Sequence, residues 1–117
     1  MDWRRTVLAI SISTFGMCGA LAQTAAPLNE IQESGGILTS QTCVVCHFPL
    51  QQGAHTYGPR LHKDTMMGDE SSLRAVISEG SQRMPGFKYM FNSQQIGAVV
   101  QFIKTLPPPP PEAAKKE

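Results

Sequence analysis

The sequence lacks an excess of charge of either sign: its 117 residues carry a formal net charge of only +1. This near balance argues against the basic surface of a nucleic-acid-binding protein and against an acidic, disordered chain. Aromatic residues make up only 7% of the chain, and it contains no internal repeat and no convincing pair of β-strands. The length is that of one domain, and the missing strand patterns leave an all-α fold as the expected class.

The chain also lacks charge over residues 7–22, directly after Arg4 and Arg5. The basic start, the apolar run and the A-x-A sequence at residues 20–22 form the three-part pattern of a secretory signal peptide. A membrane anchor is the alternative, but the run is shorter than the roughly 20 residues that a span requires. We therefore expect cleavage after Ala22 and export to a bacterial periplasm.

Two other export signals fit less well. A twin-arginine signal needs more than Arg4 and Arg5, and a lipoprotein signal at Cys18 needs a small residue where Met17 stands. We therefore divide the chain into a cleaved signal peptide (1–22), a folded domain (23–106) and a proline-rich flexible tail (107–117).

Three segments of the folded domain, residues 27–42, 69–79 and 92–105, carry apolar side chains with helical spacing. The side chains expected on their buried faces are Ile31, Ile37, Leu38, Leu73, Val76, Ile77, Ile96, Val99, Val100, Ile103 and Leu106. Residues 48–67 and 81–92 show no period and are expected to be irregular. Short helices between long loops bury little apolar surface, so the domain requires an additional stabilising cross-link, such as a covalently held cofactor.

The ends of the later helices are marked by capping residues. Asp69 or Ser71 is expected to cap the second helix, and Gly80 to follow its last turn. Asn92 or Ser93 is expected to cap the third.

Cysteine is scarce: after signal cleavage only Cys43 and Cys46 remain. An exported protein meets an oxidising compartment, where a disulfide would be expected. A disulfide between cysteines only three positions apart would close a very small loop and would stabilise the fold little. Together with His47 the pair forms C-x-x-C-H, the attachment signature of haem c. Two thiols on one helical turn can reach the two porphyrin vinyl groups, and the adjacent imidazole can reach the iron from the same face. We expect Cys43 and Cys46 to hold one covalent haem c, with His47 as proximal iron ligand.

Other uses of a cysteine pair fit less well. A zinc site needs four ligands, and His55 and His62 do not form a second closely spaced pair. A thioredoxin-like redox pair needs a β-α-β context, which the sequence does not provide.

The distal side of the haem requires a second ligand, and a soft methionine thioether suits haem iron. The candidates are Met66, Met67, Met84 and Met90. Met84 is favoured because it precedes a proline in an irregular segment, where it is free of helix geometry and can lean over the porphyrin. The other three methionines are expected to pack around the haem edge, and His62 stays a minor alternative ligand.

The order of these features resembles the class I cytochromes c, which are monohaem electron carriers with a histidine–methionine ligand pair. The matching features are Gly35, the motif at residues 43–47, Gly58-Pro59-x-Leu61, Met84-Pro85-Gly86-Phe87 and the amphipathic C-terminal helix. The resemblance implies a small cytochrome c fold of three or more short helices wrapped around one covalently bound haem, with long irregular loops.

The resemblance also implies roles for residues around the haem. The carbonyl of Pro59 would accept a hydrogen bond from the ring N–H of His47 and orient it, and Leu61 would pack on the haem. The N- and C-terminal helices would cross at Gly35 and Gly97.

One departure from the family pattern concerns this crossing. Thr39 stands where an aromatic residue is common, and Phe102 of the other helix is expected to supply that bulk.

A histidine–methionine pair leaves no open iron position, which favours electron transfer over enzymatic chemistry. The expected role is a one-electron carrier between a dehydrogenase or other donor and a downstream cytochrome or oxidase, or a small cytochrome subunit of a dehydrogenase complex. The partners are then redox proteins, with no nucleic acid and no stable membrane span after signal cleavage.

Two other classes of function stay open: an enzyme or gas sensor with an exchangeable distal ligand, and a structural role with haem only as a staple. Arg83 and Lys88 flank Met84 and either steer an acidic partner or form a solvated surface pair. No role is assigned to His55 or Tyr57.

Overall fold

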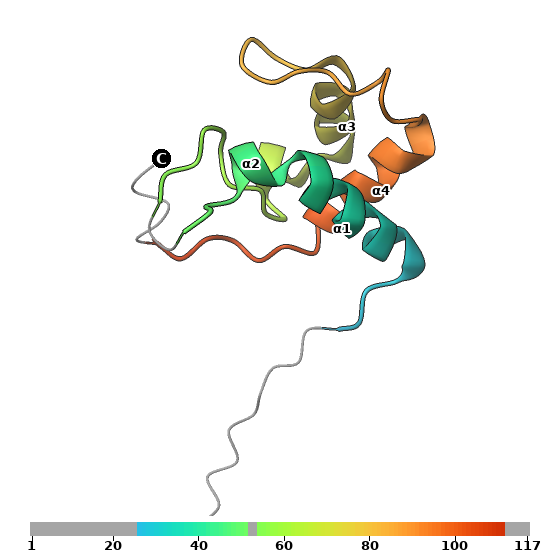
Figure 1. Cartoon of the computed structure of the whole chain (residues 1–117). Coiled ribbons are helices and arrows are strands. Elements are labelled where there is room, and N and C mark those ends of the chain that lie inside the picture. The colour runs from blue at the N-terminus through green and yellow to red at the C-terminus, as the bar shows by residue number, and fades with distance from the viewer. Residues whose placement is uncertain (1–25, 52–53, 112–117) are drawn as a thin grey trace, which may run out of the picture.

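A computed structural model describes residues 26–51 and 54–111. The predicted signal peptide and the end of the predicted tail, residues 112–117, lie outside the described residues. The elements in chain order are α1 (Glu30–Thr42), α2 (Val44–His47), the 3-10 helix η1 (Thr65–Gly68), α3 (Glu70–Glu79) and α4 (Ser93–Ile103) (Figure 1). The described residues form no strand, only an isolated antiparallel bridge between Ser81 and Met84. The prediction of an all-α fold is therefore confirmed.

Each of the three longer helices begins at a side chain that accepts a hydrogen bond from a backbone N–H three residues further on. These caps are Asn29 for α1, Asp69 for α3 and Asn92 for α4. In α1 and α4 the side chains of Gln32 and Gln95 accept a bond from the cap's own N–H, which completes a capping box. Because Asn29 is a cap, α1 begins at Glu30 and not at residue 27.

α1 packs across α4 at a very short distance (Figure 1). A Cβ atom at Gly35 would collide with the carbonyl oxygen of Ala98 on α4. Thr39, one turn later, is buried, and its hydroxyl donates a 2.7 Å hydrogen bond to the carbonyl of Gly35. The ring of Phe102 lies against Gly36, 3.0 Å from the place of a Cβ atom there, so α4 provides the bulky side chain at the crossing.

A Cβ atom at Gly97 would meet the guanidinium of Arg74 on α3. The expected buried face of α1 is partly wrong. Ile31 and Ile37 are each 59% exposed and not buried. The closest approach of the two helices lies at Gly35 and Thr39. Ile31 lies one helical turn before Gly35, ahead of this contact. Ile37 lies two residues from both Gly35 and Thr39 and therefore points to a different side of α1.

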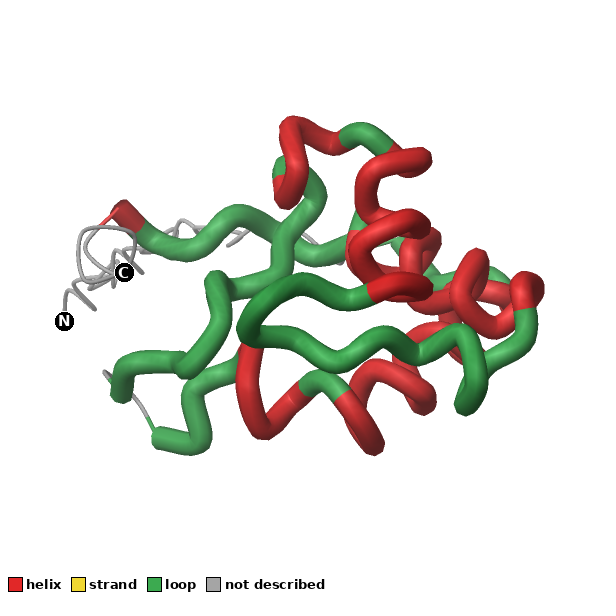
Figure 2. The backbone as a smooth tube through the Cα atoms, turned by 90° about the horizontal axis from the view of Figure 1, so that it is seen from above, coloured by secondary structure: helices red, strands yellow, loops and turns green. Residues whose placement is uncertain are grey.

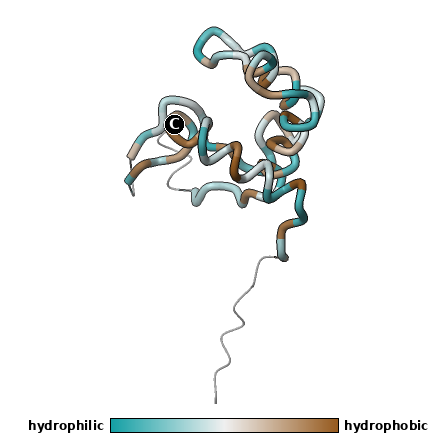
Figure 3. The backbone as a smooth tube through the Cα atoms, turned by 45° about the vertical axis from the view of Figure 1, so that its right-hand side comes forward, coloured by the Kyte–Doolittle hydropathy of each residue, from teal (hydrophilic) through white to brown (hydrophobic). Residues whose placement is uncertain are grey.

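The hydrophobic core is formed by α3, α4 and the segment between them. Its buried apolar side chains are Leu73, Ile77, Phe91, Ile96, Ala98, Val99, Val100 and Ile103. Figure 3 shows the resulting alternation of brown and teal along the helices, as expected for elements with one buried face. Between residues 40 and 72 no described apolar side chain is buried, so this half of the fold has no core of its own.

Glu70, in the first turn of α3, ties the two core helices together on their outer surface. Its carboxylate accepts hydrogen bonds from Gln101 of α4, from Lys104 directly after α4 and from Arg74. The bonds from these groups, that of Lys104 first, hold the pKa of Glu70 below its usual value.

The irregular segments follow the predicted positions (Figure 2). The described residues of the segment 48–67 are irregular apart from η1, in which Met66 and Met67 adopt the left-handed conformation with φ of 55° and 57°. The segment joins the chain after α4 through a 2.9 Å bond from Lys63 N to Leu106 O. Among the described residues no helix is long and apolar enough to cross a membrane.

The crossing at Gly35 predicts a specific sensitivity. Replacement Gly35→Ala is expected to lower the free energy of unfolding by about 1–3 kcal/mol, because the added methyl group meets a backbone carbonyl that cannot turn away. Gly36→Ala is the matched control, since the same helix gains the same residue and the methyl group meets only the ring of Phe102. Urea denaturation measures both, and equal stabilities of the two variants would contradict this description of the crossing.

Candidate functional site

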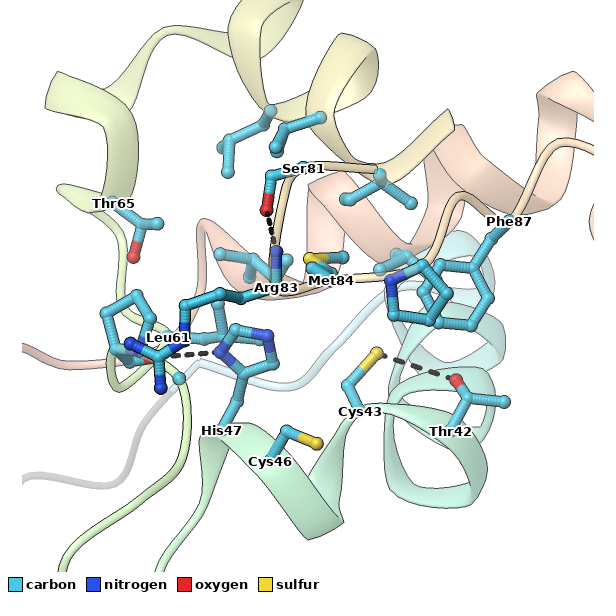
Figure 4. Close-up of a pocket in the computed structure, with 18 of the residues that line it drawn as sticks. Thr42, Cys43, Cys46, His47, Leu61, Thr65, Ser81, Arg83, Met84 and Phe87 are labelled. Atoms are coloured by element: carbon cyan, nitrogen blue, oxygen red, sulfur yellow. Dashed lines mark hydrogen bonds between the residues drawn. The ribbon is translucent and has the colours of Figure 1, made fainter. Parts of the chain in front are cut away.

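A cavity of about 340 Å³ opens on the side of the core that faces α2 (Figure 4). Its walls come from α2, from parts of the segment 57–66, from α3, from the loop 81–87 and from α4. Most of its lining is apolar and includes Leu61, Leu73, Val76, Ile77, Phe87 and Val99. The missing core of residues 40–72 is thus replaced by a cavity with hydrophobic walls, which suits a large apolar group.

His47 is the last residue of α2 and reaches into this cavity (Figure 4). It is only 9% exposed, and its Nδ1 lies 2.7 Å from the carbonyl oxygen of Pro59. A carbonyl can only accept, so Nδ1 carries the proton and donates this bond. The neutral imidazole then has its lone pair on Nε2, the atom that can coordinate a metal.

Gly58 fits closely against this imidazole. A Cβ atom at Gly58 would lie 2.8 Å from Cε1 of His47. The backbone N–H of Gly58 donates a 2.8 Å hydrogen bond to the carbonyl of Cys46. The segment before Leu61 is therefore fixed to α2 by two hydrogen bonds, one to its backbone and one to its histidine.

Cys43 and Cys46 also line the cavity, with their thiols on the same wall as His47 (Figure 4). Both are partly buried, and they form no disulfide. Burial raises the pKa of the Cys43 thiol, against the opposing effect of the Thr42 hydroxyl, 3.5 Å from its sulfur. Cys46 belongs to α2, which is only one turn long, and Cys43 is the single residue between α1 and α2.

Met84 enters the cavity from the opposite side, on the loop that joins α3 to α4 (Figure 4). The loop turns back at Gly80, which follows α3 as predicted and has a φ of 81°. Ser81 N donates a 2.8 Å bond to Met84 O, and Phe87 N donates a 2.9 Å bond to Ile77 O of α3. Met84 is partly buried and packs against the core. Its backbone is thus held on both sides by hydrogen bonds.

The other candidate ligands are placed less favourably. His62 does not line the cavity, and its Nδ1 accepts a 3.2 Å bond from Asp64 N. Met67 and Met90 do not line it either and are 97% and 65% exposed. Met66 does line the cavity, although it is 47% exposed.

One contact at the mouth of the cavity could not be predicted from the sequence. The guanidinium of Arg83 lies over the ring of Tyr57, 4.5 Å from its centroid, and donates a 3.2 Å hydrogen bond to the Tyr57 carbonyl. Lys88, the other cation of this loop, forms an ion pair with Glu79. Both cations are therefore engaged within the chain. His55 is exposed and does not line the cavity.

The residues of the cavity fit a covalently attached haem. Its walls are mostly apolar. Among the described residues that line it, the one buried ionisable side chain is that of His47, whose Nε2 is left for coordination. Two thiols lie on the wall of this histidine and a thioether on the opposite wall. The carbonyl of Pro59 contacts His47, and Leu61 lies in the lining.

The contact of Gly58 with the imidazole predicts that Gly58→Ala displaces His47. Haem-loaded protein is expected to show an altered absorption spectrum and to lose about 1–3 kcal/mol of stability, because the added methyl group overlaps the ring. Gly97→Ala is the control, since its methyl group meets only the end of the Arg74 side chain, on α3. Spectra and unfolding midpoints unchanged in both variants would show that His47 is not held this tightly.

Comparison with known proteins agrees with this geometry. The family model described as cytochrome C oxidase, cbb3-type, subunit III matches residues 31–103, a segment that contains the whole cavity-forming part of the chain from α1 to α4. A search of curated proteins gives no match. The matched segment covers more than half of the chain, so the protein belongs to this family of class I, monohaem cytochromes c, whose haem c is bound covalently.

Proposed function

We propose that this cytochrome is a periplasmic one-electron carrier in which Cys43 and Cys46 form the haem thioethers, and His47 and Met84 are the axial iron ligands. The observation that carries this proposal is the arrangement of His47 and Met84 on opposite walls of one apolar cavity, with both thiols on the histidine side. Haem c supplies an iron that changes its charge by one electron.

The residues of the chain have separate tasks in this function. The Pro59 carbonyl fixes the tautomer and orientation of His47 and raises its basicity. The apolar walls, with Leu61 and Phe87, exclude water, so little solvent has to reorganise when the charge changes. Met84 provides a soft thioether that raises the reduction potential relative to a second histidine.

A carrier fits these observations better than an enzyme or a gas sensor. Both axial positions would be taken by side chains whose backbones are fixed, His47 by a helix and Met84 by a loop bonded to itself and to α3. No position then remains for a substrate or a gas. A purely structural haem would not need Met84 on the second wall.

Redox proteins are the proposed partners. The donor would be a dehydrogenase or another cytochrome, and the description of the matching family, a subunit of an oxidase, supports an oxidase or its cytochromes as acceptor. A place as a small subunit of a redox complex is the alternative to a diffusible carrier. Because Arg83 and Lys88 contact Tyr57 and Glu79, they are less available to steer an acidic partner than the sequence indicated.

The ligand assignment predicts the effect of Met84→Ala. The weak charge-transfer band of ferric iron bound to methionine sulfur is expected to disappear, and the reduced protein is expected to bind carbon monoxide rapidly, because the distal position is open. Met66→Ala is the matched control, since Met66 is the other methionine that lines the cavity. Absorption spectra of both oxidation states measure the two effects.

The outcomes separate the candidates. Loss of the band in Met66→Ala but not in Met84→Ala would assign Met66 as the ligand. A band that persists in both variants would contradict methionine ligation by either residue.

The export signal leads to a prediction about the mature chain. After expression in a bacterium with a haem-attachment system, the haem-loaded protein is expected in the periplasmic fraction, beginning at Gln23. Mass spectrometry of the intact protein measures the start and the added haem. A chain that keeps residues 1–22 and sediments with membranes would show an uncleaved anchor in place of a signal peptide.

A further inference from the structure

The contact between Arg83 and Tyr57 joins two loops that hold opposite sides of the site. Tyr57 precedes Gly58 and Pro59, the residues that contact His47. Arg83 precedes Met84 directly. The two residues are 26 positions apart in the chain, and both line the cavity. This contact is therefore a direct connection between the histidine side and the methionine side across the cavity mouth.

The two ends of the contact differ in how firmly they are held. The Tyr57 end is fixed to α2, because Gly58 N bonds to the Cys46 carbonyl and Pro59 O bonds to His47. The Arg83 end belongs to a tight turn held by two backbone bonds between Ser81 and Met84, 2.8 and 3.4 Å long, and by a 3.4 Å bond from Arg83 N to the Ser81 hydroxyl. Those bonds shape the turn but do not attach it to the opposite wall. The Arg83 side chain makes that attachment.

The geometry suits a contact of moderate strength. A guanidinium plane stacks on an aromatic face and donates to a carbonyl at the same time, which an ammonium group cannot match. Both side chains are exposed, Tyr57 at 58%, so water weakens the attraction. Cation–π contacts at exposed sites shift an equilibrium by about two- to fivefold.

We propose that Arg83 is a positioning residue for the distal ligand: by stacking on Tyr57 it holds the loop 81–87 closed, so that Met84 leaves the iron less often. This inference rests on the proposed ligation by Met84. It assigns Tyr57 a function that the sequence did not reveal, as the fixed surface against which the loop closes.

The test uses the rate at which the reduced, haem-loaded protein binds carbon monoxide. Carbon monoxide can enter only while Met84 is off the iron, so the rate measures how often the loop opens. Arg83→Gln and Tyr57→Ala are each expected to raise it by about two- to fivefold. The double variant is expected to bind no faster than Arg83→Gln, because that change alone removes both the stacking and the hydrogen bond to the Tyr57 carbonyl.

Two controls separate the contact from general effects. Lys88→Gln removes the same charge from the segment that follows Met84, but its partner is Glu79, at the end of α3 from which the loop departs. Tyr57→Phe keeps the ring and the carbonyl. Both are expected to bind carbon monoxide at the wild-type rate. Amide hydrogen exchange of residues 81–86 provides a second measure, which is expected to rise only in Arg83→Gln and Tyr57→Ala.

The outcomes distinguish the two proposals. If Met84→Ala binds carbon monoxide much faster than wild type while Arg83→Gln does not differ from wild type, the positioning role is overturned and the ligand assignment stands. Equal rises in Arg83→Gln and Lys88→Gln would also overturn it, because charge and not the contact would be responsible. If wild type already binds as fast as Met84→Ala, the ligand assignment falls and the positioning role falls with it.

Discussion

The close approach of α1 to α4 at Gly35 determines where the site lies. α2 follows α1 after a single residue, so the orientation of α1 also sets the positions of Cys43, Cys46 and His47. α4 meets α1 with one face and lines the cavity with another, through Val99 and Ile103. The attachment motif and the rear wall of the cavity are thus fixed relative to each other by one backbone contact. A larger residue at position 35 would move both.

The two sides of the cavity are stabilised in different ways. On the proximal side, a helix turn and the Pro59 carbonyl fix a single side chain, His47. On the distal side, Met84 depends on a loop between two core helices. The segment of residues 40–72 buries no apolar side chain of its own among the described residues. A haem attached through the two cysteines of this segment would give its apolar side chains a surface to pack against, so the cofactor would have a structural task beside its redox task.

Local patterns predicted much of this structure. The spacing of apolar residues gave α3 and α4 with their buried faces, and the C-x-x-C-H motif gave three residues that line one wall. Contacts between distant segments were predicted poorly. A glycine shows that something is close but not what it is, and at Gly97 a Cβ atom would meet Arg74 of α3. Ile31, seven residues before Leu38, has the spacing of a buried face, whereas the contact with α4 uses Gly35 and Thr39, which carry little hydrophobic signal. The Arg83–Tyr57 contact has no local pattern at all.

The irregular segment between α3 and α4 is ordered by contacts that its sequence does not display. Phe87 N bonds to Ile77 O, Lys88 N bonds to Ser78 O, and the rings of Phe87 and Phe91 stack with their centroids 5.7 Å apart. These contacts attach the C-terminal half of the segment to α3 and to the core, while Arg83 attaches the N-terminal half to the opposite wall. Met84 lies between the two attachments. An electron carrier has to keep its ligands in both oxidation states, and a loop held at both ends meets this requirement without a helix.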